Sequence, residues 1–286
     1  MQRAPDHPDP RRGQSSLRPR RRRLVTRAPG NGRGDPGPVT APSAALVDDH
    51  PLFPLETALV PGVALTVRVF EPRYLTLVGR LGLAADGDRV SIGRAGPLGH
   101  FGVVLVERGS EVGGGDERRS VGVAVAVRRA APAEGRWLLE LTALRRCRVE
   151  RWLPDDPHPR GVVRVLDDET PDPGPDGAEL VATVVGELLR LVRLVRVLGP
   201  TRWVVGAPLR HLHGPRPPRV DPSDPRSLTE LSWWVAATAP LGPLDRQSLL
   251  EAPDPVTRLV RARRLLGEAA DLAERLGPAD GAGTLG

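Results

Sequence analysis

Residues 52–74 constrain the fold of this chain more than any other segment; they read LFPLETALVPGVALTVRVFEPRY. Proline has no backbone N–H, so Pro54 and Pro61 are expected at strand edges and turns, and the Pro-Gly pair at position 61 is a strong turn signal. Between residues 64 and 70, apolar and polar side chains alternate with the period of a half-buried strand. Pro72 then suits the first turn of a helix. The segment therefore predicts a strand edge, a turn, a strand and a helix in succession.

The periodicity of apolar residues changes along the chain. Up to about residue 166 it predicts short strands, at residues 101–107, 121–127, 136–143, 145–152 and 161–166. From about residue 172 it predicts helices, from Asp176 to Leu198, from Asp224 to before Pro240, from Leu244 to Ala252 and from Asp254 to Gly277. The run Asp176-Gly177-Ala178-Glu179 resembles a capping box at the first of these helices. This order favours an α+β chain, in which a compact barrel-like β unit (50–168) precedes a helical unit (169–277).

Positive charge is concentrated at the N-terminus. Residues 1–49 contain ten arginines and five acidic residues, a net charge of +5, which leaves +1 of the total +6 for the rest of the chain. This segment is rich in Pro, Gly and Arg and lacks apolar periodicity, so we expect it to be a disordered tail, like residues 278–286. Three interpretations stay open: a solvated extension, a translated upstream region if the true start lies nearer residue 40, or a contact for nucleic acid or an acidic partner.

The composition excludes several classes of protein. The sequence has no run of about 18 uncharged apolar residues and no apolar stretch after its first arginine cluster, so we expect no membrane span, no secretory signal and a cytoplasmic location. Its single cysteine, Cys147, excludes an internal disulfide framework and a cysteine-based zinc site. Cys147 falls within an alternating segment and is expected to be a small buried hydrophobe.

The sequence contains no lysine: all 41 of its Lys and Arg positions are arginine. The guanidinium of arginine stays protonated, so it cannot act as the neutral base that activates a serine nucleophile. The G-x-x-x-x-G-K-[ST] loop that binds phosphates is also missing. We therefore predict that this chain is not an enzyme and holds neither catalytic residues nor a cofactor.

Other polar clusters are weak candidates for chemistry. His211 and His213 are spaced to share one face of a strand as half of a metal site, but no third ligand is nearby in sequence, and a solvated loop is favoured. The acidic runs at residues 155–156 and 167–169 lie next to prolines and are expected to be solvated. The glycines at 113–115 are followed by charged residues rather than a helix start, so they predict a turn and not a phosphate site.

Trp233 and Trp234 are adjacent on one predicted helix. Neighbouring helical positions point about 100° apart, so both rings cannot face the core. We expect one to be buried and the other exposed, which makes this pair a candidate interface anchor.

Several short motifs follow one another in an order that resembles the N-terminal, substrate-binding domain of the Lon protease family. They include FEPRY at residues 70–74, FGVVL at 101–105 and RRCRV at 145–149, and together they cover residues 50–276. The residues that match the family pattern most directly are Phe53, Pro54, Leu55, Pro61, Gly62, Phe70, Glu71, Pro72, Arg73, Tyr74, Phe101, Gly102 and Gly109.

The resemblance implies a PUA-like β pseudo-barrel followed by a C-terminal helical bundle. It also implies a non-catalytic module that binds unfolded or apolar protein segments, for presentation to a protease, with no catalytic, cofactor or metal residue to carry over. We interpret the signature as structural, with Phe70 and Tyr74 packing the corner between strand and helix. The alternative function is RNA binding, since PUA-like barrels also bind RNA; the near-neutral charge outside the tail makes nucleic acid the less favoured partner.

Overall fold

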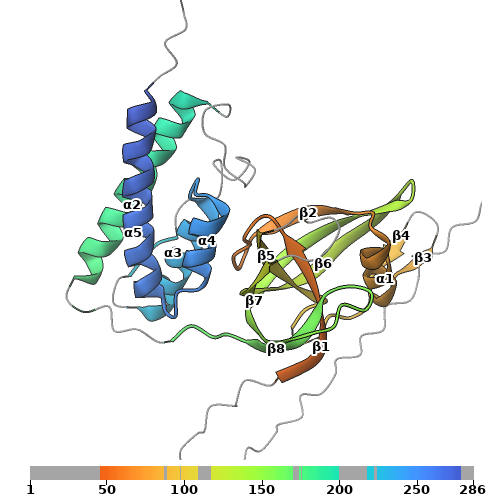
Figure 1. Ribbon diagram of the computed structural model, residues 1–286. Helices are drawn as coiled ribbons and strands as arrows, with labels where there is room; N and C mark the ends of the chain where they lie inside the picture. Colours follow the sequence, from red (N-terminus) through yellow and green to blue (C-terminus); the bar gives the residue numbers. More distant parts are fainter. Residues whose placement is uncertain are drawn as a thin grey trace, which may run out of the picture. The chain divides into compact units, whose positions relative to one another are not determined.

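The computed structural model describes residues 46–86, 89–96, 98–108, 117–169, 174, 176–199, 218–221 and 224–277. The strands within these ranges are β1 (Leu46–Leu55), β2 (Ala64–Val69), β3 (Ala84–Asp86), β4 (Arg89–Ser91), β5 (Phe101–Arg108), β6 (Glu117–Ala133), β7 (Arg136–Leu153) and β8 (Arg160–Val165). The helices are α1 (Pro72–Arg80), α2 (Gly177–Leu198), α3 (Pro225–Thr238), α4 (Pro243–Leu250) and α5 (Pro255–Leu276) (Figure 1). The expected order, strands first and helices second, is confirmed.

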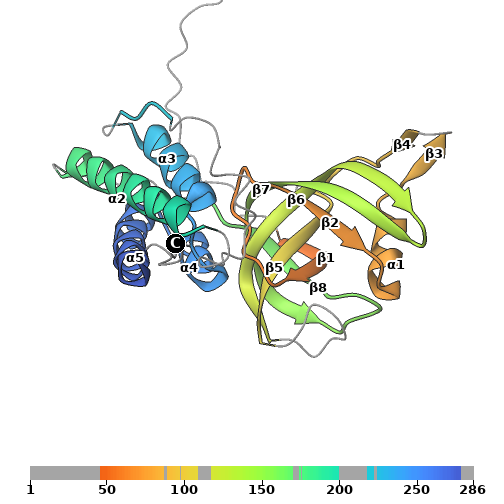
Figure 2. The same cartoon turned by 90° about the horizontal axis from the view of Figure 1, so that it is seen from above.

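Six of the strands form one sheet that closes on itself. Their order is β2-β7-β6-β5-β1-β8, and an additional β7–β8 pairing completes the ring. Strand β7 is long enough to have two partners on one side: its first half pairs with β2, and its second half pairs with β8. Strands β1 and β5 are parallel, and the other pairs of this sheet are antiparallel. The predicted pseudo-barrel is therefore present, with β2 attached beside the closed ring (Figure 2).

Strands β6 and β7 are longer than their sequence patterns predict. The segments 136–143 and 145–152, expected as two strands, are a single strand that continues to Leu153. Strand β6 begins at Glu117 and reaches Ala133, where a tight turn leads into β7. Its register shifts between Ala124 and Val125, and such a bulge lets a long strand bend around a barrel without ending.

The predicted boundary of the N-terminal tail is wrong by four residues. Strand β1 begins at Leu46, and Leu46 and Val47 pair with Arg164 and Val163 of β8. Pairing through backbone groups needs no apolar periodicity, so the sequence gave no signal for this extension. The segment 46–49 thus belongs to the compact unit formed by residues 42–286, and residues 1–45 lie outside the described part.

Strand β5 and the second half of β1 are buried on both faces. Neighbouring residues such as Val103 and Val104 belong to different apolar clusters, as do Leu52 and Phe53. A strand that is covered on both sides reads as a nearly continuous apolar run, which explains the valine-rich segments. The larger cluster continues from the strands through α1 and into the helices α2–α5.

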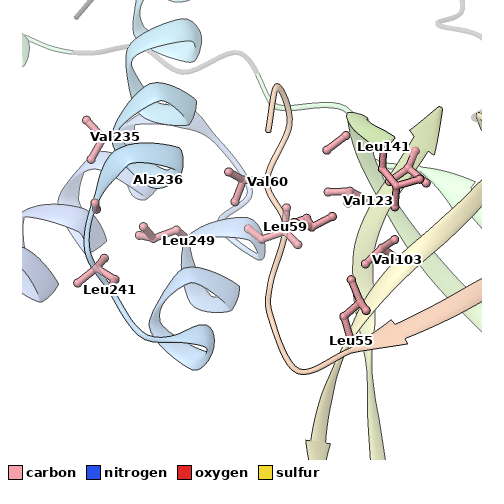
Figure 3. Close-up of a cluster of buried hydrophobic side chains, with 14 of the residues drawn as sticks. Leu55, Leu59, Val60, Val103, Val123, Leu141, Val235, Ala236, Leu241 and Leu249 are labelled. Atoms are coloured by element: carbon pink, nitrogen blue, oxygen red, sulfur yellow. The ribbon is translucent and has the colours of Figure 1, made fainter. Parts of the chain in front are cut away.

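The loop between β1 and β2 joins the barrel to the helices. It carries Leu59 and Val60, which are 5% and 0% exposed. Figure 3 shows Leu59 and Val60 between barrel residues such as Val123 and helical-side residues such as Leu249. Because these apolar side chains are removed from water on both sides, the loop ties the two halves into one core.

The helix boundaries agree with the predictions, but one cap does not. Asp224 and Asp254 accept hydrogen bonds from the backbone N–H groups of Arg226 and Thr257, as N-cap residues do. Asp176 precedes α2 without any side-chain capping bond, so the predicted capping box is wrong. Its φ and ψ of −90° and 4° are not the extended values that aim an N-cap side chain at the helix.

Candidate functional site

A groove of about 380 Å³ lies between β1, β2 and the start of α1. Its lining consists of Phe53, Pro54, Leu55, Thr66, Val67, Arg68, Val69, Phe70, Glu71 and Tyr74. Six of the residues that were singled out from the sequence therefore lie around one groove. The four β2 residues were not predicted as part of a site, because alternation shows which face of a strand is buried but not which edge is open.

The floor of the groove is apolar. The rings of Phe53 and Tyr74 lie 4.3 Å apart between centroids, and Phe101 supports Phe53 from behind at 5.9 Å. Val67 and Val69 point inward from β2 and are buried. Aromatic pairs of this kind add about 0.5–1.5 kcal/mol beyond the burial of their area, so the floor is part of the packed core.

Phe70 lies at the rim, and its predicted burial is wrong. Its side chain is 56% exposed, whereas Tyr74 is 2% exposed. Side chains alternate along β2, so with Val67 and Val69 facing inward the next residue faces outward. Tyr74, from the first turns of α1, fills the corner instead.

The charged side chains at the groove differ in whether they form ion pairs. Arg73 donates from Nε to Glu71 at 2.9 Å, and its guanidinium lies 4.6 Å from the ring centroid of Tyr74. Arg68 is exposed on the outward face of β2 and forms no ion pair with any described residue. The rim therefore carries one cation that is available to a ligand.

The outer edge of β2 is unpaired. This strand pairs with β7 on one side and with no other strand in the described ranges. The N–H of Ala143 donates to the carbonyl of Val63, which fixes the hydrogen-bonding phase of the ladder. Because that phase alternates in an antiparallel pair, the backbone groups of Val67 face β7 and those of Thr66 and Arg68 face the groove.

The opposite wall, β1, stays paired with β5 through Leu55, but its other edge is open beyond Leu52. Its pairing with β8 stops at Pro51, and the N–H of Leu52 still donates to the carbonyl of Pro159. Two residues later the same side of β1 is occupied by Pro54, which has a carbonyl but no N–H. The prediction that Pro54 lies at a strand edge is confirmed, and the gap between β1 and β2 is the groove.

The remaining signature residues shape the surrounding backbone. Gly62 has a φ of 85° in the turn before β2, a conformation that favours glycine, and its N–H donates to the carbonyl of Ala143. Pro72 is the first residue of α1. A Cβ at Gly102 would approach a side-chain carbon of Leu52 to 2.7 Å, so a larger residue there would force Leu52 to move. Gly109 lies outside the described residues.

Comparison with known proteins identifies the family. The ATP-dependent protease La (LON) substrate-binding domain matches residues 49–268, well over half of the chain. The chain belongs to this family. Two solved structures are similar. The Lon N-terminal domain protein from Xanthomonas campestris is 25% identical over 75% of this chain and 96% of that chain, with a TM-score of 0.46. The N-terminal domain of Mycobacterium avium complex Lon protease is 15% identical over 78% of this chain and 98% of that chain, with a TM-score of 0.44. The comparison with curated proteins found no match.

The two tryptophans of this LON domain do not form the predicted exposed anchor. Trp233 and Trp234 are both half-buried, against the expectation that one would be buried and the other exposed. Trp233 donates from Nε1 to Asp168 at 3.2 Å, and the guanidinium of Arg258 lies 3.4 Å from its ring centroid. The ring is therefore held by contacts within the domain.

Asp168 is the centre of a buried ionic network, so the expected solvation of its acidic run is correct only for Asp167 and Glu169, which are exposed. Its Oδ1 accepts from Arg146 of β7 at 2.7 Å and from Arg258 of α5 at 2.5 Å. The two arginines are 4% and 0% exposed. Desolvation by burial lowers the pKa of both, that of Arg258 to about 10, in opposition to the nearby carboxylate. Their further donors reach carbonyls at residues 249–253.

None of the described side chains of the LON domain forms a recognisable catalytic or metal centre. Cys147 is fully buried, as predicted, and burial raises its pKa to about 12, so its thiol stays protonated. No group of three or more potential metal ligands occurs among the described residues. His211, His213 and the glycines at 113–115 lie outside them. The described helices include none that is long and apolar enough to span a membrane.

Proposed function

We propose that this LON substrate-binding domain is a non-catalytic module that binds unfolded or apolar segments of other proteins in the groove between β1 and β2. The observation that carries the proposal is the apolar floor beside an exposed aromatic rim. Phe53, Val67 and Tyr74 form a preformed apolar surface, and Phe70 is 56% exposed next to it. Folded clients bury such apolar residues, so the groove would discriminate in favour of unfolded ones.

The charge distribution supports a protein ligand over a nucleic acid. Residues 50–286 carry a net charge of +1, and the lining of the groove includes one basic residue, Arg68, and one acidic residue, Glu71. Nucleic-acid sites instead present a stripe of basic residues that neutralises several phosphates. Apolar contact is therefore the main source of affinity that the groove offers.

The module would act together with a protease. The sequence has no lysine for a Ser–Lys dyad or a phosphate-binding loop, so it offers no machinery for cleavage or ATP hydrolysis. A role in holding clients for a cytoplasmic ATP-dependent protease accounts for both the family and the missing chemistry.

Binding to an unfolded client such as casein tests the proposal. We expect binding by the full chain to persist as salt rises from about 0.05 to 0.5 M, a range over which phosphate-driven binding falls by orders of magnitude. Phe70→Ser should weaken client binding. Leu244→Ser is the matched control, because Leu244 lies on α4 outside the groove and is 57% exposed.

Two results would contradict the proposal. The first is sub-micromolar, strongly salt-dependent binding of single-stranded RNA by residues 42–286, which would favour the alternative function. The second is ATP-dependent casein cleavage by protein that has been freed of host proteases.

A further inference from the structure

We propose that the groove binds its ligand as an extended peptide that adds a strand to the outer edge of β2, with apolar side chains facing Val67 and Val69 and acidic side chains beside Arg68. The inference rests on the proposed function and specifies its ligand: a segment in which apolar and acidic residues alternate. It makes the backbone of the ligand, and not only its apolar surface, part of what is recognised.

The main chain of β2 favours a strand-like ligand. The N–H and C=O groups of Thr66 and Arg68 face the groove, and no hydrogen bond from a described residue reaches this edge. Such an edge is a template for another extended chain, and added strands bind through these backbone groups. The opposite wall is less suited to pairing because Pro54 has no N–H to donate, so the ligand is assigned to β2.

The side chains of β2 define the pattern of the ligand. Val67 and Val69 face the apolar floor, whereas Thr66 and Arg68 face solvent. Residues opposite each other on paired strands point to the same face, so successive ligand side chains must alternate between the floor and the solvent. A volume of about 380 Å³ lies within the range of about 300–1,000 Å³ that is usual for ligand pockets.

Charge complementarity specifies the outward positions. The other cation at the rim, Arg73, is already paired with Glu71 at 2.9 Å. Arg68 is exposed and has no ion-pair partner among the described residues. An acidic ligand residue opposite or diagonal to Arg68 lies within the reach of a cross-strand pair, whereas a basic one would be repelled.

Synthetic peptides that alternate valine and glutamate are suitable probes, with fluorescence anisotropy as the measurement on the full chain. Methylating the amide nitrogens of one alternating set removes the donors on one edge of the peptide only. One of the two methylated peptides should bind at least about tenfold more weakly, and the other within about threefold of the parent. The sensitive set would be the glutamates for an antiparallel strand and the valines for a parallel one.

A charge exchange tests the second half of the inference. Arg68→Glu should lower the affinity for the glutamate peptide by about three- to tenfold and raise the affinity for a peptide with lysine at the same positions. Arg263→Glu, at an exposed position on α5, is the matched control and should change neither affinity. The circular dichroism spectrum of each variant establishes that it is folded.

The inference is overturned if both methylated peptides bind as tightly as the parent, or if Arg68→Glu leaves the preference for charge unchanged. It is also overturned if the peptides fail to bind while β2 edges pair two copies of the chain, which sedimentation would reveal as a dimer. Casein binding distinguishes a failure of this inference from a failure of the proposed function. If the chain binds casein but binds both methylated peptides as tightly as the parent peptide, the proposed function stands and the strand-pairing inference is wrong.

Discussion

Replacing Asp168 by alanine should destabilise the domain more than replacing any exposed acidic residue. The carboxylate of Asp168 accepts hydrogen bonds from two arginines, Arg146 and Arg258, that are almost completely removed from water. Its second oxygen accepts from the indole of Trp233. Alanine would leave two buried guanidinium groups without the carboxylate that binds both, with only the weaker fields of Asp167, Glu169 and Asp254 to offset their charge.

The magnitude follows from burial. Removing one partner of a buried ion pair typically costs about 3–5 kcal/mol, because the remaining charge stays desolvated. Two features of this network reduce the cost: the side chain of Asp168 is 15% exposed, and backbone carbonyls such as that of Ala252 still accept from the arginines. We therefore expect a loss of about 3 kcal/mol, out of about 5–15 kcal/mol for the whole domain.

Urea unfolding followed by tryptophan fluorescence measures this loss. With a slope of about 1–3 kcal/mol per molar urea, the midpoint should fall by about 1–3 M. Asp155→Ala is the matched control, because Asp155 also binds an arginine, Arg118, at 2.7 Å but is 37% exposed. An exposed pair contributes about 0–1 kcal/mol.

Equal midpoints for the two variants would refute the reasoning, since they would show that the arginines around Asp168 are hydrated in solution. A change of slope would show instead that the barrel and the helices unfold in separate steps once the network is lost. Asp168→Asn distinguishes charge from hydrogen bonding, because the amide retains an acceptor oxygen but removes the negative charge.

Three further predictions follow from the fold. Deleting residues 1–45 should leave the thermal midpoint of unfolding within a few degrees of that of the full chain. Deleting residues 1–49 should lower the midpoint more, because this truncation removes the first residue pairs between β1 and β8. Burial lowers the pKa of His50 from 6.5 to about 4, so between these pH values the unfolded chain binds a proton that the native state excludes. The free energy of unfolding should therefore fall by up to about 3 kcal/mol as pH drops from 6.5 to 4. An unchanged free energy of unfolding over this range would contradict the burial of His50. Phe53→Ala should lower the free energy of unfolding by about 3–5 kcal/mol through lost packing. Phe70→Ala should lower it by less than about 0.5 kcal/mol, because the ring of Phe70 is exposed. If calorimetry gave the larger loss for both variants, both rings would lie in the core.

Much of the fold could be predicted from local signals in the sequence. Aspartate-proline pairs at Asp224 and Asp254 mark the starts of α3 and α5, and the Pro-Gly pair at position 61 marks the turn before β2. These signals work because caps and turns depend on the conformation of a few adjacent residues. The strand extension at Leu46 and the continuous β7 had no such signal, since their lengths depend on partners distant in sequence.

The candidate site could be predicted only in part. The family signature pointed to Phe53 and Tyr74, which form the floor of the groove, but it also suggested a buried Phe70. The face of a residue on a short strand depends on which neighbours pack inward, and Val69 occupies the inward position next to Phe70. Asp168 looked like one acid in a solvated run because nothing near it in sequence shows Arg146 or Arg258.

The sequence by itself determined the main element types and their order, because periodicity and turn residues are local properties. Only the tertiary structure decided which strand edges stay open and which charges are buried. One edge of β1 and one edge of β2 are unpaired, because the pairing between β1 and β8 ends at Pro51 and β8 pairs only with the second half of β7, whose first half pairs with β2. Likewise, Asp168 is half-buried because residues from β7, α3 and α5 converge on it, and this convergence depends on the fold of the whole chain rather than on any one segment.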